Sequence, residues 1–261
     1  MSKKMGVEMR NTISVEFLKL KRARALLLSV IAGITPPMIK FIQYTFGRSS
    51  ADVSWEKFLS SGQEIMVLCM LMSVILVSGF VYSMEYQYDT ASYIFTSVSS
   101  REKIYLSKMI LLLAVFVLLF GVSLVSQLLF GVLTLRAIIP WPVFVKLLNV
   151  TAWYILSYFL VSAIVAMVAV LIKKFVVSAV VVFGYLMLVF PFHLKNNPYI
   201  CPFMTPAVVA AKIFDSKDYY LMGYYESYKV DIAGMAIFLA VLAVASIAVG
   251  IACYKKMDAV R

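Results

Sequence analysis

The chain has 261 residues, of which 63% are hydrophobic and only 14% charged. A soluble domain averages about half and about a quarter, so the composition excludes an ordinary soluble enzyme and predicts an all-α polytopic membrane protein. The formal net charge of +11 is compatible with a nucleic-acid partner. The basic residues, however, lie between apolar runs, which is the pattern that sets membrane orientation, so we expect no nucleic-acid binding.

Six apolar runs are long enough to cross a bilayer, because about 20 apolar residues in a helix span the hydrocarbon core. They are approximately Ala25–Phe46, Ile65–Met84, Met109–Leu135, Val150–Ile172, Phe175–Phe192 and Ile232–Tyr254. An even number of spans places both termini on the same side of the membrane. We therefore expect residues 1–261 to form a single transmembrane domain with six helices.

The distribution of Lys and Arg predicts which side that is. Most of the 24 Lys and Arg residues fall in the two terminal tails, in the connection between the second and third spans, and in the short turn after the fourth. Positively charged segments of this kind stay in the cytoplasm, so both termini are predicted to be cytoplasmic. Residues 1–24 are too charged for the apolar core of a cleavable signal peptide.

Residues 1–24 are also predicted to form an amphipathic elbow helix ahead of the first span. Apolar side chains recur there at helical spacing with charged ones between them: Met9, Ile13, Phe17 and Leu20, with Arg10, Glu16, Lys19 and Lys21. Such a pattern is typical of a helix that lies in the membrane interface. The alternative is a solvated basic tail that only fixes the topology.

A few polar side chains inside or beside the spans are candidates for a substrate pathway. Lys40 lies in the outer half of the first span, where it can either extend to the outer interface or pair with Glu64 at the start of the second span. Ser123 and Gln127 are the notable polar groups of the third span. They can line a pathway or hydrogen-bond between packed helices.

The segment Glu85–Lys108 is a polar island between two long apolar blocks. It mixes both charge signs with aromatic residues, and so cannot remain in lipid, although it has enough apolar surface for short helices at the membrane surface. This mixture favours a docking site for a soluble partner. A structured connecting loop without a partner is the alternative.

The segment 193–231, between the fifth and sixth spans, is the longest predicted outer segment. It is rich in Pro and Tyr and contains an apolar stretch, Ala207–Phe214, that is too short to span. Short re-entrant or interfacial helices fit this pattern best. Because Tyr favours the headgroup zone, the segment is placed where an amphiphilic substrate is met, or else it forms a plain aromatic belt.

The sequence contains no recognisable catalytic constellation. No Gly-x-x-x-x-Gly-Lys-Ser/Thr phosphate loop is present, and the single histidine, His193, and three cysteines have no metal-ligand spacing. Acidic residues are missing from the span centres, where a proton relay would need them. We expect no enzyme activity, metal or cofactor in this chain, and an external source of energy if it moves a substrate.

Several of these features together resemble the permease subunits of the ABC type-2 exporter family. The basic elbow Glu16-Phe17-Leu18-Lys19-Leu20-Lys21-Arg22, Glu85 followed by Thr90, Ser99-Ser100-Arg101, and Lys108 carry the likeness, together with the six-span plan. Family members often have Gly before the Thr and Pro-x-Ser-Arg in the turn. This chain has Asp89 and Val98-Ser99-Ser100-Arg101 at those places.

The resemblance implies that a separate ATPase, which binds ATP and Mg²⁺, docks on the elbow and on the island. The residues that it assigns to this coupling are Glu16, Lys19, Glu85, Thr90, Ser100, Arg101 and Lys108. It also implies a second permease copy or a paralogue, and contact with membrane lipid. Among family members the chain looks most like permeases of bacitracin and lantibiotic resistance or immunity transporters, which implies amphiphilic peptide substrates and the cell membrane of a Gram-positive bacterium.

Two alternatives remain open on the sequence. The first is an exporter of another cargo, such as a lipid-linked glycan, sodium or a drug. The second is a membrane sensor or scaffold that transports nothing and whose island docks a regulatory kinase.

Overall fold

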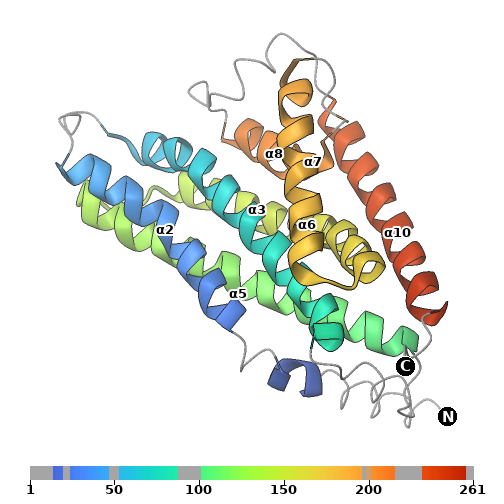
Figure 1. The fold of residues 1–261 in the computed structure, drawn as a ribbon. Coiled ribbons are helices and arrows are strands. Elements are labelled where there is room, and N and C mark those ends of the chain that lie inside the picture. Colours follow the sequence, from blue (N-terminus) through green and yellow to red (C-terminus); the bar gives the residue numbers. More distant parts are fainter. Residues whose placement is uncertain are drawn as a thin grey trace, which may run out of the picture.

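The computed structural model is a bundle of long helices (Figure 1), and no strand occurs in the part of the chain that it describes. It describes residues 14–19, 24–46, 53–87, 101–195, 199, 201–214 and 231–256. The helices are α2 (Arg24–Phe46), α3 (Trp55–Gln87), α5 (Arg101–Leu135), α6 (Trp141–Ile172), α7 (Phe175–Lys195), η2 (Pro202–Met204), α8 (Thr205–Ile213) and α10 (Ile232–Lys256). The predicted all-α class is confirmed.

Four described segments are long and apolar enough to cross a membrane: Ile65–Gln87, Arg101–Leu135, Trp141–Ile172 and Ile232–Lys256. The first predicted span coincides with α2. The apolar part of α7, Phe175–Val189, is shorter than a typical span. Six spans and cytoplasmic termini therefore remain predictions.

Several helices continue beyond the apolar runs. α3 begins at Trp55 rather than near Ile65, α5 begins at Arg101 rather than at Met109, and α6 begins at Trp141 rather than near Val150. Hydropathy detects only the membrane-embedded part of a helix, whereas backbone hydrogen bonding continues into polar flanking residues. The ends of the predicted island are thus helical, and its residues 88–100 lie outside the described residues.

α2 stays helical through Pro36 and Pro37, and α5 compensates for part of the missing backbone bonding. Pro37 has no N–H to donate to the carbonyl of Gly33, four residues earlier. The Ser126 hydroxyl of α5 lies 3.4 Å from that carbonyl and 2.9 Å from the carbonyl of Ser123, so its single proton is shared between the two. Gly33 allows the approach, because a Cβ there would lie 3.2 Å from the carbonyl oxygen of Leu119. Membrane helices commonly satisfy such freed carbonyls with hydroxyls from a neighbouring helix.

The centre of the bundle combines aromatic packing with a few hydrogen bonds. The ring of Phe120 on α5 stacks on Tyr154 and Tyr158 of α6, with centroids 5.7 and 5.4 Å apart. The Tyr154 hydroxyl donates to Gln63 Oε1 of α3 at 2.8 Å, and Gln63 Nε2 donates to the carbonyl of Leu59 at 3.2 Å. The Tyr154 hydroxyl and the Gln63 amide are thus paired with each other and with the backbone, as a membrane interior favours.

The described part of the segment between α7 and α10 folds inward. α8 is short, and nearly all its residues are buried: Thr205, Pro206, Ala207, Val208, Val209, Ala210 and Ala211. It packs against α3, α6 and α10, and Trp153 of α6 donates its indole N–H to the carbonyl of Pro206 at 3.3 Å. A short helix is present where the sequence predicts short re-entrant or interfacial helices; its position relative to the membrane remains a prediction.

Candidate functional site

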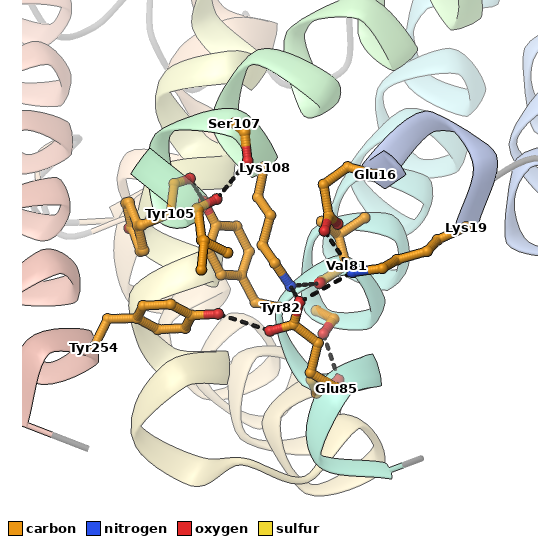
Figure 2. A network of polar contacts seen from close by, with 12 residues as sticks. Glu16, Lys19, Val81, Tyr82, Glu85, Tyr105, Ser107, Lys108 and Tyr254 are labelled. Carbon is orange, nitrogen blue, oxygen red and sulfur yellow. Dashed lines mark hydrogen bonds and ion pairs between the residues drawn. The ribbon is translucent and has the colours of Figure 1, made fainter. Parts of the chain in front are cut away.

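A cluster of buried charges joins three helix ends and the short helix 14–19. The last turns of α3, the first turns of α5 and the last turn of α10 meet at one end of the bundle, here called the charged end (Figure 2). Four charged side chains form ion pairs there: Glu16, Lys19, Glu85 and Lys108. These four are among the coupling residues predicted from the sequence.

Glu85 lies at the centre of the cluster. Its carboxylate is 1% exposed and interacts with three groups that come from three other elements. Lys108 Nζ of α5 lies 3.0 Å from Oε1, Lys19 Nζ lies 3.4 Å from the same oxygen, and the Tyr254 hydroxyl of α10 donates to Oε2 at 2.7 Å. One carboxylate at the end of α3 thereby connects the helix 14–19, α5 and α10.

Lys108 is buried completely, at 0% exposure, and is nevertheless well satisfied. Besides its pair with Glu85, its ammonium donates to the carbonyl of Val81 at 2.8 Å and lies 5.6 Å from the centre of the Tyr82 ring. A cation near the carboxyl end of a helix also interacts favourably with the helix dipole. These contacts offset the cost of removing the ammonium from water.

Lys19 links the helix 14–19 to α3. Its ammonium lies 2.6 Å from Glu16 Oε1 and 3.4 Å from Glu85 Oε1. Burial works against the charged form, but the two carboxylates outweigh this effect and raise the pKa of Lys19 above its usual value. The cluster therefore holds two carboxylates and two ammoniums, so its formal charges balance.

The helix 14–19 presents its polar side to the bundle. Glu16 is 2% exposed, whereas Val15, Phe17 and Leu18 are 51%, 43% and 64% exposed. Apolar side chains that point away from the protein are expected for a helix that lies in the membrane interface. The helix 14–19 lies within the predicted elbow, residues 1–24, and the position of that elbow in the membrane interface remains a prediction.

A wall of tyrosine rings closes one side of the cluster. The Tyr82 hydroxyl donates to the carbonyl of Tyr105 at 3.0 Å, and the two rings lie 4.9 Å apart. The ring of Tyr105 in turn meets Tyr254 edge-on at 5.9 Å. All three tyrosines are buried, so they exclude water from the Glu85 pairs and strengthen their electrostatic interaction.

Arg101 belongs to the charged end but has a different partner. Its Nη1 donates to the backbone carbonyl of Lys255 at 2.7 Å, and the neighbouring Glu102 forms an ion pair with the Lys255 side chain. The first turn of α5 therefore binds the last turn of α10. Thr90 and Ser100 lie outside the described residues.

The predicted pathway residues do not join this cluster. Ser123 and Gln127 of α5 are buried against α3, where their side chains contact Met66 Sδ at 3.9 and 3.4 Å. This geometry suits hydrogen bonding between packed helices. Lys40 is half-buried on α2, and the side chain of Glu64 is not among those described, so the pair between them remains a prediction.

Sequence reasoning missed the tyrosines of this site. Tyr254 closes the last predicted span, Tyr82 lies near the end of the second span, and Tyr105 lies inside the island close to the third span. At such positions Tyr is ordinarily read as an interface anchor. No spacing rule connects residues 82, 105 and 254. The sequence feature that could have pointed to them is that all three lie at or near span ends on the same predicted side of the membrane.

The chemistry of the cluster favours holding helices together over catalysis. Among the described residues no group of three His, Cys, Asp or Glu side chains can hold a metal ion. Each ammonium instead bridges separate elements. If one partner of a buried pair is removed, a charge is left uncompensated, which typically costs about 3–5 kcal/mol.

Comparison with known families adds an independent finding. A family model described as "ABC-2 family transporter protein" matches residues 12–189, which is more than half of the chain. The matched range includes Glu16, Lys19, Glu85, Arg101 and Lys108. A search of curated proteins finds no match to the chain.

Proposed function

Because this chain belongs to the ABC-2 family of transporter proteins, we propose that it is the membrane subunit of an exporter driven by a separate ABC ATPase. Family membership assigns it a role in transport as a membrane component and implies an ABC ATPase partner. The ATPase binds ATP and Mg²⁺, and this chain supplies the membrane pathway and the surface on which the ATPase docks.

The observation that carries the proposal is the position of the charge cluster. Glu85 at the end of α3 and Arg101 to Lys108 at the start of α5 are the two ends of the island Glu85–Lys108, which is predicted to dock the ATPase. Glu85 is paired with both Lys108 and Lys19. A force applied to the island therefore acts on α3, α5 and the helix 14–19 together.

The proposed cargo is an amphiphilic peptide antibiotic of the bacitracin or lantibiotic type. The family likeness noted above and the Tyr-rich segment 193–231 support this choice. The proposed setting is the cell membrane of a Gram-positive bacterium, with a second copy of the chain or a paralogue completing the pathway. The experiment below distinguishes this cargo from another cargo and from a sensor that transports nothing.

The experiment measures substrate-stimulated ATP hydrolysis by the ATPase complex in proteoliposomes, with bacitracin and nisin as probes. Lys19→Met is the informative variant, because Lys19 is 27% exposed and contacts Glu85 from the elbow side. Loss of the Lys19 ammonium should disturb folding less than loss of the ammonium of the fully buried Lys108. Lys256→Met, which removes an exposed cation from α10 at the same end of the bundle, is the matched control.

We expect Lys19→Met to retain the ATPase and its basal turnover but to lose most of the stimulation by peptide, while Lys256→Met behaves like the wild type. Equal stimulation in both variants would contradict the coupling role of the cluster. If a wild-type complex hydrolyses ATP but responds to neither peptide, the cargo assignment is wrong and the transport role stands. Substrate clearance without any ATP turnover would contradict export driven by an ATPase.

A further inference from the structure

We infer that α10 carries movement from the charged end to the buried outer helix α8, with Tyr254 as the positioning residue. This inference rests on the proposed function, since it describes where a force applied by the ATPase goes. It is carried by the contacts at the two ends of α10 and by the exposure of the helix between them.

At the charged end, α10 is bound by side chains of both α3 and α5. Tyr254 donates to Glu85 Oε2 at 2.7 Å, and Arg101 donates to the backbone carbonyl of Lys255, in the last turn of α10, at 2.7 Å. Gly250 lies against Tyr105 so closely that a Cβ would be 2.5 Å from its hydroxyl oxygen. Figure 2 shows Tyr254 reaching from α10 to Glu85 beside the Tyr105 ring. The end of α10 must therefore follow the helix ends that flank the island.

Between its ends α10 touches the bundle along one narrow face. Its buried residues follow one another at steps of three or four: Met235, Leu239, Ala243, Ser246, Gly250 and Tyr254. Residues on the opposite face are strongly exposed, with Ile237 at 64%, Val241 at 61% and Val244 at 66%. α10 packs against α6, and its buried face includes the small side chains of Ala243 and Ser246, which allow helices to approach closely. A helix held on one face in this way can tilt or slide as a rigid body.

At its opposite end α10 meets the segment that contains α8. The Tyr199 ring packs edge-on against Phe238, with centroids 5.7 Å apart, and the Tyr199 hydroxyl lies 2.7 Å from where a Cβ on Gly234 would be. α10 also packs against η2 and α8. In Figure 1 the red helix α10 runs along the bundle from the charged end to the region of α8. One rigid element thus contacts both regions.

The test measures the chemical reactivity of a residue on α8 while the ATPase hydrolyses ATP at the charged end. Lys212, which is exposed on α8, is replaced by Cys in a chain whose native cysteines are changed to Ala. Its rate of reaction with a polar maleimide is measured in nanodiscs that contain the ATPase complex, with and without ATP and vanadate. The clasp variant is Tyr254→Phe, which removes the hydrogen bond to Glu85 and keeps the ring of Tyr254. Val244→Leu, on the exposed face of α10, is the control.

We expect ATP and vanadate to change the reaction rate of Lys212→Cys in the parent and in Val244→Leu, and the change to be lost in the clasp variant although basal ATP hydrolysis persists. A change that persists in the clasp variant would overturn the role of α10. The role of α10 would also be overturned if the parent complex hydrolysed ATP while the reaction rate of Lys212→Cys stayed unchanged. If no ATPase associates with the parent chain, the proposed function itself fails, and this result is distinguished by the absence of ATP hydrolysis.

Discussion

Glu85 and Lys108 face each other in a space closed to water, and neither side chain has an alternative route to solvent. Their exposures are 1% and 0%, so each charge depends on the other and on the groups around it. A buried ion pair is a weak source of net stability, but breaking one is costly. We therefore expect the pair to act mainly by fixing the register between α3 and α5.

Replacement of Lys108 by Met should lower the free energy of unfolding by about 3–5 kcal/mol, because it leaves the Glu85 carboxylate buried with weaker compensation. Equilibrium unfolding in mixed micelles measures this difference. The double variant Glu85→Gln with Lys108→Met should be more stable than the sum of the two single effects predicts, since paired residues are not additive. Lys256→Met is the control, and a Lys108→Met chain as stable as Lys256→Met would contradict the pairing.

Cys201 should react slowly with alkylating reagents. Burial raises the pKa of its thiol to about 11, although the backbone N–H groups of Phe203 and Met204 hydrogen-bond to it and act in the opposite direction. At pH 8 such a thiol holds roughly a hundredth of the thiolate of an ordinary cysteine. Raising the pH above about 9 should also destabilise the fold, because the unfolded chain then releases a proton that the folded chain retains.

Iodoacetamide labelling with peptide mass mapping measures that reactivity. Lys212→Cys, exposed on the adjacent α8, gives the reference rate in the same region of the molecule. Labelling of Cys201 as fast as that of Lys212→Cys at pH 8 would show that the thiol is accessible and that α8 is not packed as described.

At the scale of elements, close approach between helices depends on individual glycines. A Cβ on Gly131 of α5 would lie 2.3 Å from the Trp55 ring at the start of α3, whereas Gly121 of the same helix has no described neighbour within 4 Å. Gly131→Ala should therefore destabilise the chain by about 1–3 kcal/mol through overpacking. Gly121→Ala should be neutral or slightly stabilising, because Ala favours the helix.

Thermal unfolding of the two glycine variants in detergent measures this contrast. Adding Trp55→Leu to Gly131→Ala removes the ring that the new methyl group meets and should restore part of the lost stability. If Gly131→Ala and Gly121→Ala unfold at the same temperature, the contact between α3 and α5 is not as close as the structure describes.

The elements also show where prediction from the sequence succeeds. Hydropathy located the apolar part of each long helix, and the composition of 193–231 indicated a short helix such as α8. The helices α3, α5 and α6 begin earlier in the chain than the predicted spans do, because polar residues that continue a helix leave no apolar signal. The close approaches at Gly33 and Gly131 depend on which helices are neighbours, which periodicity does not specify.

The candidate site was predicted only in part. The resemblance to ABC type-2 permeases implied a coupling role for Glu16, Lys19, Glu85 and Lys108, which the structure brings together; that role remains a prediction. Tyr254 was not foreseen, since it lies far along the chain from Glu85 and its hydroxyl becomes a partner only after the bundle forms. Long-range pairing of this kind is a property of the folded bundle.

At the scale of the whole molecule, most ion pairs between described residues lie at the charged end, while many large apolar side chains of the described helices are exposed. This arrangement suits a membrane subunit that receives its energy from outside. No phosphate loop occurs in the sequence, and the family to which the chain belongs implies an ABC ATPase partner. The charged end is where the helices that flank the island are joined, so we place the partner there.

The most direct measurement is purification of the chain from its host membrane in mild detergent, with mass spectrometry of the subunits that accompany it. We expect a soluble ABC ATPase at a fixed ratio, and we expect Arg101→Glu, which reverses a charge beside residues 88–100, to reduce its recovery, whereas Lys256→Met leaves recovery unchanged. Recovery of a kinase instead of an ATPase, or of no soluble subunit at all, would contradict the exporter assignment.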